Sequence, residues 1–255
     1  MSGPQSELDT SRALLCEMGF ELVPTTLPEI LERAVKEKLS MPAFLDLVMK
    51  NERDFREERR VRAMLKISGL PAGKTMESYD FTFHRGADRE KMALLGTCEF
   101  ARRKENVLLL GPPGVGKTHL AAGLGVKAVQ NGFSVTFLSA DELLDLLRRD
   151  ESVPGRRLMR RKYMNCAVLV VDELGFQALD RKDAHLLFRL VSHRYERGST
   201  ILTSNKGVRE WPEMLAGDEA LATAILDRLL HHCHVVAIDG RSFRLREIEK
   251  QIKGK

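Results

Sequence analysis

The segment Gly111-Pro-Pro-Gly-Val-Gly-Lys-Thr118 has the residue types and the spacing of a loop that binds phosphate groups. It follows the apolar run 107–110, and a buried strand that leads through a glycine-rich loop into a helix turns backbone N–H groups toward an anion. Gly114 and Gly116 let the backbone approach the phosphates without a Cβ in the way. The residues expected to hold the nucleotide are Gly111, Pro112, Pro113, Gly114, Val115, Gly116, Lys117, Thr118 and His119.

Two side chains at the end of this loop are expected to carry chemistry. Lys117 would reach the β- and γ-phosphates, and the Thr118 hydroxyl would bind Mg²⁺. The two prolines have no N–H group, so the backbone donors are expected from residues 114–118. The loop therefore predicts a site for ATP and Mg²⁺.

A second apolar run, residues 166–171, ends in Asp172 and Glu173. Such a strand end lies at the edge where α/β sheets bind ligands. Asp172 is expected to order the Mg²⁺ shell, and Glu173 to polarise a water for in-line attack on the γ-phosphate. A base placed for water favours hydrolysis, and a P-loop kinase acting on a small molecule stays the lower alternative.

A third polar residue, Asn205, follows the run Thr200-Ile-Leu-Thr-Ser204, which predicts a further strand ending at the same edge. We interpret Asn205 as the residue that positions the attacking water or senses the γ-phosphate. Thr203 and Ser204 are second choices for this role.

From Tyr79 onward strands and helices alternate, which predicts a parallel sheet covered on both faces. Asp88, Asp141 and Asp180 are the predicted helix caps. Strands are expected near 107–110, 134–138, 167–172, 200–204 and 234–238. Helices are expected near 88–103, 117–130, 140–149, 156–163, 180–197 and 218–231.

Before Tyr79, apolar residues at helical spacing over 27–68, with a restart at Ser40-Met-Pro42, predict a small helical domain. Its dense mixed charge over 51–60 fits either a solvated face with ion pairs or a partner-binding surface. Gly69 and Pro71 are expected to end the helix. The predicted organisation is a helical partner- or DNA-docking domain over 1–75, a linker over 69–78 and an ATPase domain over 79–255.

The composition sets the class of protein. The 255 residues are 43% hydrophobic and 30% charged, which permits a full globular core. Four separated cysteines without a CxxC pair indicate neither a disulfide framework nor a zinc knuckle. No apolar stretch is long enough to span a bilayer, and the first residues lack the regions of a signal peptide. We therefore expect a cytoplasmic protein with no membrane partner.

The net charge of +5 arises from a basic segment between Arg148 and Lys162. Within it, four arginines follow a spacing that would place their guanidiniums on one side of a helix. Their contact with the phosphate backbone of duplex DNA would be neutral to sequence. The predicted DNA-binding residues are Arg156, Arg157, Arg160, Arg161 and Lys162.

The stretch His231-His-Cys-His234 places four ligand-type residues together. Consecutive residues cannot all face one ion on a regular helix or strand, and the second cluster that would complete a site is missing. The sequence therefore predicts no metal site here.

Five motifs together closely resemble those of the IstB family, AAA+ ATPases that assist the transposase of insertion sequences and are relatives of DnaC-type helicase loaders. The resemblance covers nearly the whole chain. It implies an α/β fold: a P-loop AAA+ three-layer α/β/α domain with a parallel five-stranded sheet, preceded by a small all-α N-terminal domain, with the C-terminal lid absent or vestigial. The motifs lie at 111–119, 170–175, 194–205, 225–232 and 240–246.

The resemblance also implies residue roles. The strand of Asn205 would lie between the phosphate-loop strand and the Asp172 strand, which makes Asn205 the sensor 1 residue. Arg228 matches the arginine finger that completes a neighbouring subunit's ATP site, and Arg244 matches the sensor 2 arginine. Residues 79–83 are expected either near the adenine or in the core.

The function implied is ATP-dependent regulation of DNA transposition. A homo-oligomer would bind duplex DNA with ATP, recruit or stimulate a cognate transposase, and hydrolyse ATP. The alternative is a DnaC-type replicative helicase loader, which has the same ATPase site but a helicase as partner and single-stranded DNA as ligand.

Overall fold

The computed structural model describes residues 4–82, 88–158, 161–240 and 242. Contacts divide the chain into two compact units, Met1–Ala63 and Met64–Lys255. The division falls within one long helix, α3 (Met41–Ser68), and so precedes the boundary at 75 that the sequence predicts.

The first unit is helical, with α1 (Pro4–Glu17), α2 (Val23–Lys36) and the first part of α3. The helix restart predicted at 40–42 is confirmed by the start of α3. The sequence analysis did not predict α1. Its Leu8 and Leu15 side chains pack against the hydrophobic core of this unit. That core is formed by Val23, Leu27, Ile30 and Val48.

Glu52, in the charged stretch 51–60, is buried and caps the start of α2. Its carboxylate accepts hydrogen bonds from the N–H groups of Glu21, Leu22 and Val23 at 2.8, 2.9 and 3.1 Å. Burial opposes ionisation, but the bonds from Val23, Arg56 and Leu22 hold the pKa of Glu52 below its usual value. One acid of this stretch is therefore structural.

The second unit contains a parallel five-stranded sheet in the order β2-β3-β4-β1-β5. This confirms the expected sheet, and it confirms that the strand before Asn205 lies between the other two site strands. The strands are β1 (Asn106–Leu110), β2 (Val135–Ser139), β3 (Val168–Leu174), β4 (Ser199–Ser204) and β5 (Cys233–Ala237).

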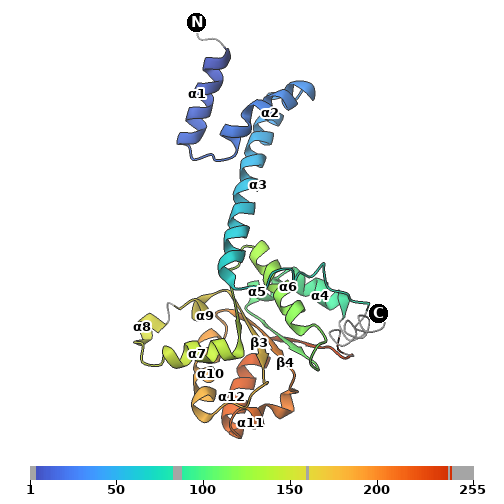
Figure 1. Ribbon diagram of the computed structural model, residues 1–255, viewed down its shortest axis with the longest axis vertical. Coiled ribbons are helices and arrows are strands. Elements are labelled where there is room, and N and C mark those ends of the chain that lie inside the picture. Colours follow the sequence, from blue (N-terminus) through green and yellow to red (C-terminus); the bar gives the residue numbers. More distant parts are fainter. Residues whose placement is uncertain (1–3, 83–87, 159–160, 241, 243–255) are drawn as a thin grey trace, which may run out of the picture. The chain divides into compact units, whose positions relative to one another are not determined.

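Helices cover both faces of this sheet, as Figure 1 shows, which confirms the three-layer fold. Leu169 and Val171 of β3 enter the core beneath α7, α10 and α12, and the alternating Val168 and Val170 face the layer that contains α6. The helices are α4 (Arg89–Gly96), α5 (Glu99–Arg103), α6 (Lys117–Gln130), α7 (Ala140–Arg149), α8 (Gly155–Leu158), α9 (Lys162–Asn165), α10 (Arg181–Arg194), α11 (Trp211–Met214) and α12 (Glu219–Leu230), with a 3-10 turn at Val208–Glu210.

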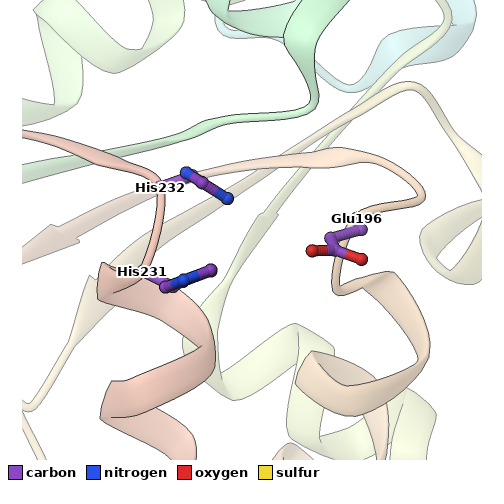
Figure 2. A group of neighbouring side chains, drawn as sticks. All are labelled: Glu196, His231 and His232. Atoms are coloured by element: carbon purple, nitrogen blue, oxygen red, sulfur yellow. The ribbon is translucent and has the colours of Figure 1, made fainter.

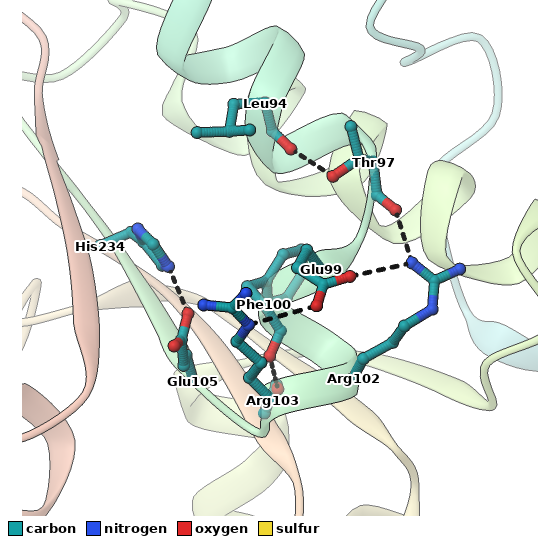
Figure 3. A network of polar contacts seen from close by, with 9 residues as sticks. Leu94, Thr97, Glu99, Phe100, Arg102, Arg103, Glu105 and His234 are labelled. Atoms are coloured by element: carbon teal, nitrogen blue, oxygen red, sulfur yellow. Dashed lines mark hydrogen bonds and ion pairs between the residues drawn. The ribbon is translucent and has the colours of Figure 1, made fainter.

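The single helix predicted over 88–103 is wrong, because the chain forms α4 and α5 there. Cys98 between them is buried and has a left-handed backbone (φ 61°), a conformation that a right-handed helix cannot continue through. The Thr97 hydroxyl donates to the carbonyl of Leu94 at 2.7 Å, and Arg102 donates to the carbonyl of Thr97 at 3.3 Å (Figure 3). These bonds link the end of α4 to α5.

Two of the three predicted caps are confirmed: the side chains of Asp88 and Asp180 accept N–H groups of the first turns of α4 and α10. The third, Asp141, is wrong. The cap of α7 is Ser139, whose hydroxyl accepts the N–H of Glu142 at 3.1 Å while the Glu142 carboxylate accepts the N–H of Ser139 at 2.8 Å. This reciprocal pair caps the helix, and Asp141 is instead the second residue of its first turn.

The helix predicted over 156–163 is also wrong. The short helices α8 and α9 stand in its place, and Arg161 precedes α9 with extended backbone angles (φ −65°, ψ 143°). Arg161 donates to the buried carboxylate of Asp150 at 2.6 Å, and the Tyr163 hydroxyl donates to the same carboxylate at 2.7 Å. Arg157 and Arg161 therefore do not lie on one continuous helix. The side chain of Arg156 and the whole of Arg160 lie outside the described residues.

Residues 69–78, the predicted linker, pack within the second unit. Gly69 ends α3 with φ 75°, and a Cβ there would lie 2.9 Å from the carbonyl oxygen of Phe137 in β2. Leu70 lies against Gly125 of α6. By these contacts the segment belongs to the second unit.

Arg194, at the end of α10, is 3% exposed and joins two neighbouring segments. Its guanidinium donates to the carbonyl oxygens of Tyr163, Met164 and Cys166 at 3.3, 3.3 and 3.0 Å, and to that of Ser199 at 2.6 Å. The end of α9 is thereby tied to the start of β4.

The C-terminal end of the second unit is described as far as residues 238–240 and 242, so Arg244 and the segment expected to hold any lid lie outside the described residues. In the described part of the chain, no helix is both long and apolar enough to cross a membrane.

Candidate functional site

The glycine-rich loop joins the end of β1 to the start of α6. Gly116 is the N-cap residue of α6 with φ 91°, and a Cβ there would lie 2.6 Å from Cε2 of Tyr79, so only glycine fits. Tyr79 supports the loop by donating its hydroxyl to the carbonyl of Val115 at 3.1 Å. Burial, with a smaller contribution from Asp80, raises the pKa of Tyr79 to about 12, so the phenol remains a donor at neutral pH.

Lys117, the first residue of α6, is 7% exposed. Its Nζ donates to the carbonyl oxygens of Gly111 and Pro112 at 2.7 and 2.8 Å. The ammonium is thus held inside the loop, where the N-terminus of α6 also favours negative charge.

Asp172, in β3, is 5% exposed and accepts two hydroxyl hydrogen bonds at one oxygen. Thr118 donates to Oδ1 at 3.1 Å, and Thr203 of β4 donates to the same atom at 2.5 Å. The Thr203 oxygen in turn accepts the backbone N–H of Glu173 at 2.8 Å. Thr203 therefore holds the side chain of Asp172 and the backbone of Glu173. The sequence analysis gave Thr203 only as a second choice for positioning the water or sensing the γ-phosphate.

Glu173 lies where the pairing of β3 with β4 shifts register, between Val171 and Leu174. Its backbone is left-handed (φ 63°), which is uncommon for a residue with a side chain. The side chain is exposed and lines a cavity of about 270 Å³. The predicted residues that line this cavity together are Pro113, Gly114, Gly116, Lys117, Thr118, His119 and Glu173.

Asn205 follows β4, whose last residue, Ser204, pairs with Leu110 of β1 and Leu174 of β3. The Asn205 Oδ1 atom is buried and has no hydrogen-bond partner among the described residues. An unsatisfied buried acceptor costs about 1–3 kcal/mol, which a bound water or ligand would recover. Asn205 therefore follows a strand that lies between β3, which carries Asp172, and β1, which leads into the phosphate loop. Its side-chain oxygen can still accept a hydrogen bond.

Arg228 is not among the described residues that line this cavity. It lies on α12, where its guanidinium carbon is 4.9 Å from the centroid of the Phe188 ring and Nη1 donates to the carbonyl of Ala224 at 2.8 Å. The structure thus separates Arg228 from the residues that the phosphate loop brings together.

A second cavity, of about 660 Å³, shares Tyr79 with the first. Phe81 also lines it, and its ring meets that of Tyr79 edge to face at 4.8 Å. Such ring faces beside a phosphate loop suit a purine base. His119 Nε2 is 2.9 Å from the Thr75 carbonyl and so fixes the segment that precedes Tyr79. Phe83, the last residue of the predicted 79–83 group, lies outside the described residues.

The residues predicted to bind DNA divide into two groups. Arg157, Arg161 and Lys162 are all exposed, but Arg161 also forms an ion pair with the buried carboxylate of Asp150. Arg148, at the start of the basic segment, also has carboxylate partners, chiefly Asp183, which raises the pKa of this arginine. Among the described side chains of the basic segment, Arg148 and Arg161 are therefore paired with carboxylates within the fold.

The strand order and the cluster of Lys117, Thr118 and Asp172 at the phosphate loop define a P-loop nucleotide-binding protein of the AAA+ class. Two solved structures share this fold. DnaI matches with a TM-score of 0.55 and 20% identity, covering 67% of this chain and 95% of its own. DnaA from Aquifex aeolicus matches with a TM-score of 0.53 and 22% identity, covering 73% of this chain and 56% of its own.

The family is given by the sequence match. Residues 13–251 match the model of the IstB-like ATP binding proteins, and the chain belongs to this family. An ATP-binding protein of insertion sequence IS21 from Pseudomonas aeruginosa is 45% identical over 239 residues, covering 93% of this chain and 89% of the relative. That of insertion sequence IS5376 from Geobacillus stearothermophilus is 41% identical, covering 85% and 86%.

Proposed function

We propose that this chain hydrolyses ATP in a Mg²⁺-dependent reaction and uses that reaction to regulate DNA transposition. The observation that carries the hydrolysis is the Thr203 bridge, which fixes buried Asp172 and left-handed Glu173 beside the phosphate loop. A carboxylate held next to a phosphate site and open to its cavity is the arrangement that a water-activating base requires.

The donor atoms near the loop fit Mg²⁺. The Thr118 hydroxyl and Asp172 Oδ1 lie 3.1 Å apart, and both are the hard oxygen ligands that this ion prefers. When bound, Mg²⁺ would neutralise charge that develops on the phosphate oxygens. Lys117 would exchange its carbonyl partners for the same phosphates.

In the proposed reaction Glu173 accepts a proton from water as the water oxygen attacks the γ-phosphorus. The bond from the γ-phosphorus to the bridging oxygen of the β-phosphate breaks, and ADP and phosphate are released. Asn205 Oδ1 would orient that water by accepting a hydrogen bond from its second O–H group. Arg228, from a neighbouring subunit, and Arg244 would stabilise the transition-state charge.

The insertion-sequence relatives support a role on DNA. In the proposal, a homo-oligomer binds duplex DNA without sequence preference through Arg156, Arg157, Arg160 and Lys162, with Arg161 holding the segment in place. The helical domain over 1–75 would dock the cognate transposase or DNA. The fold that the chain shares with DnaI does not separate this role from helicase loading.

Phosphate release by the full chain, measured with ATP and Mg²⁺ in the presence and absence of duplex DNA, tests the proposal. We expect turnover that needs Mg²⁺, rises with duplex DNA and is lost in Lys117→Ala. A wild-type chain that binds ATP without turnover under either condition would contradict the hydrolytic role.

Co-precipitation separates the two partner classes. The full chain with ATP is offered the cognate transposase and, separately, a hexameric replicative helicase. Capture of the transposase supports the transposition role, whereas capture of the helicase alone supports the loader.

A further inference from the structure

The turn between α12 and β5 brings His231 and His232 together on one side. His231 is the C-cap of α12 and keeps helical backbone angles, whereas His232 lies between α12 and β5, so the two are not consecutive positions of one regular element. Their ring centroids are 4.1 Å apart. The objection that consecutive residues on a helix or strand diverge therefore does not apply to this pair.

The structure adds a ligand-type side chain from elsewhere in the chain. Glu196, in the turn between α10 and β4, faces the two histidines (Figure 2). One ligand atom from each of the three residues lies within 4.8 Å of those of the other two, and all three side chains are exposed. The Glu196 carboxylate is therefore a third ligand from another part of the chain, which the sequence pattern alone did not reveal.

The other two members of the His231–His234 stretch are engaged elsewhere. His234 Nε2 is 2.7 Å from the carboxylate of Glu105 (Figure 3). Cys233 is the first residue of β5 and packs, partly buried, against the hydrophobic core. The histidine pair and Glu196 are thus distinct from the rest of the stretch.

Tyr195 orients the group. Its hydroxyl lies 2.8 Å from Nδ1 of His231, which leaves Nε2 as the nitrogen for a metal. Histidines that bind metals characteristically hold their second nitrogen in such a bond, because it fixes the ring.

We propose that His231, His232 and Glu196 bind one divalent transition-metal ion of borderline character, with Zn²⁺ as the representative. Two imidazole nitrogens and one carboxylate oxygen are a ligand set that Zn²⁺ accepts, with a fourth position left for water. Ligand atoms around tetrahedral Zn²⁺ are about 3.3 Å apart, so these exposed side chains would move closer together to bind the ion. The bound ion would tie the α10–β4 turn to the end of α12, the helix that carries Arg228.

Isothermal titration of the full, reduced chain with Zn²⁺ tests the site, with millimolar Mg²⁺ present to occupy the hard oxygen ligands near Thr118. We expect one Zn²⁺ per chain, loss of binding in His231→Ala, His232→Ala and Glu196→Ala, and affinity about tenfold lower in Tyr195→Phe. His185→Ala, which removes another exposed histidine, is the matched control and should bind as the wild type does.

Thermal unfolding gives an independent measurement. Zn²⁺ should raise the midpoint of the wild type and of His185→Ala, and should leave the three ligand variants unchanged, since an ion that binds only the native state stabilises it. Zn²⁺ binding that persists in the His231→Ala, His232→Ala and Glu196→Ala variants would overturn the assignment, and so would a wild-type chain that binds none.

Discussion

The phosphate loop (111–118) and the basic segment (148–162) belong to the same unit, but their functional groups are held in different ways. In the loop, backbone geometry between β1 and α6 sets the site, and Gly116 can only be glycine. In the basic segment, the position of Arg161 is set by Asp150, a partner outside the pattern of arginines. The function of a motif that acts through backbone conformation can thus be predicted from its own residues. The function of a charge pattern also depends on carboxylates elsewhere in the chain that pair with it.

The sharpest test of the phosphate-loop side of this comparison is Glu173→Gln. The amide cannot accept the proton from water, so kcat should fall by about 10²- to 10⁴-fold while ATP binding is kept. Steady-state phosphate release and titration with a fluorescent ATP analogue measure the two. Equal loss of binding and turnover would remove Glu173 from the role of base.

On the side of the basic segment, Asp150→Ala should destabilise the fold. It leaves the buried Tyr163 hydroxyl and Arg161 without their acceptor, which should cost about 2–3 kcal/mol, or a midpoint about 4–10 °C lower. Circular dichroism during heating measures this. Asp145→Ala is the control, because its ion pair with Arg148 is exposed and should contribute little. Equal effects of the two variants would contradict the structural role of Asp150.

Thr203→Val tests whether the bridge in the phosphate-loop region matters beyond the backbone. The variant keeps the shape of a 1% exposed side chain but removes the bonds to Asp172 and Glu173. Bonds to charged groups contribute about 1.5–3 kcal/mol, so kcat should fall about 10- to 100-fold. Thr203→Ser, which keeps the hydroxyl, should retain most of the wild-type kcat. A kcat as low as that of Thr203→Val, at unchanged stability, would show that the hydroxyl does not support turnover.

The smallest expected effect distinguishes Arg157 and Lys162 from Arg161, which is paired with Asp150. Replacing Arg157 and Lys162 together with alanine should lower the magnitude of the salt dependence of DNA binding by about two, if each residue meets one phosphate. Arg161→Ala should leave that slope unchanged and lower stability instead. Fluorescence anisotropy at several salt concentrations measures the slopes, and a reversed result would return Arg161 to the DNA-binding surface.

The fold was largely predictable because its signals are local. Apolar runs near 107–110 and 167–172 predict β1 and β3 closely, and Asp180 predicts the start of α10. The errors arise where a tertiary contact decides. Cys98, which is buried, breaks a helical pattern with a left-handed backbone, and Ser139 caps α7 through a reciprocal bond with Glu142.

The site was predictable in its motifs but not in its connections. Lys117, Thr118 and Glu173 meet at one cavity, as their motifs imply. The role of Thr203 depends on the register between β3 and β4, which no sequence pattern encodes. A hydroxyl next to the polar end of an otherwise apolar strand is the signal that could have ranked it first. Glu196 is likewise brought to His231 by the fold alone.

Arg194 has a consequence for how the chain after the basic segment is held. Its planar guanidinium, with five donors, spans from the carbonyls that end α9 to Ser199 of β4, a reach that the point charge of a lysine would not reproduce. Arg194 therefore ties Tyr163–Cys166, the residues that follow the basic segment, to the start of β4, the strand that leads to Asn205.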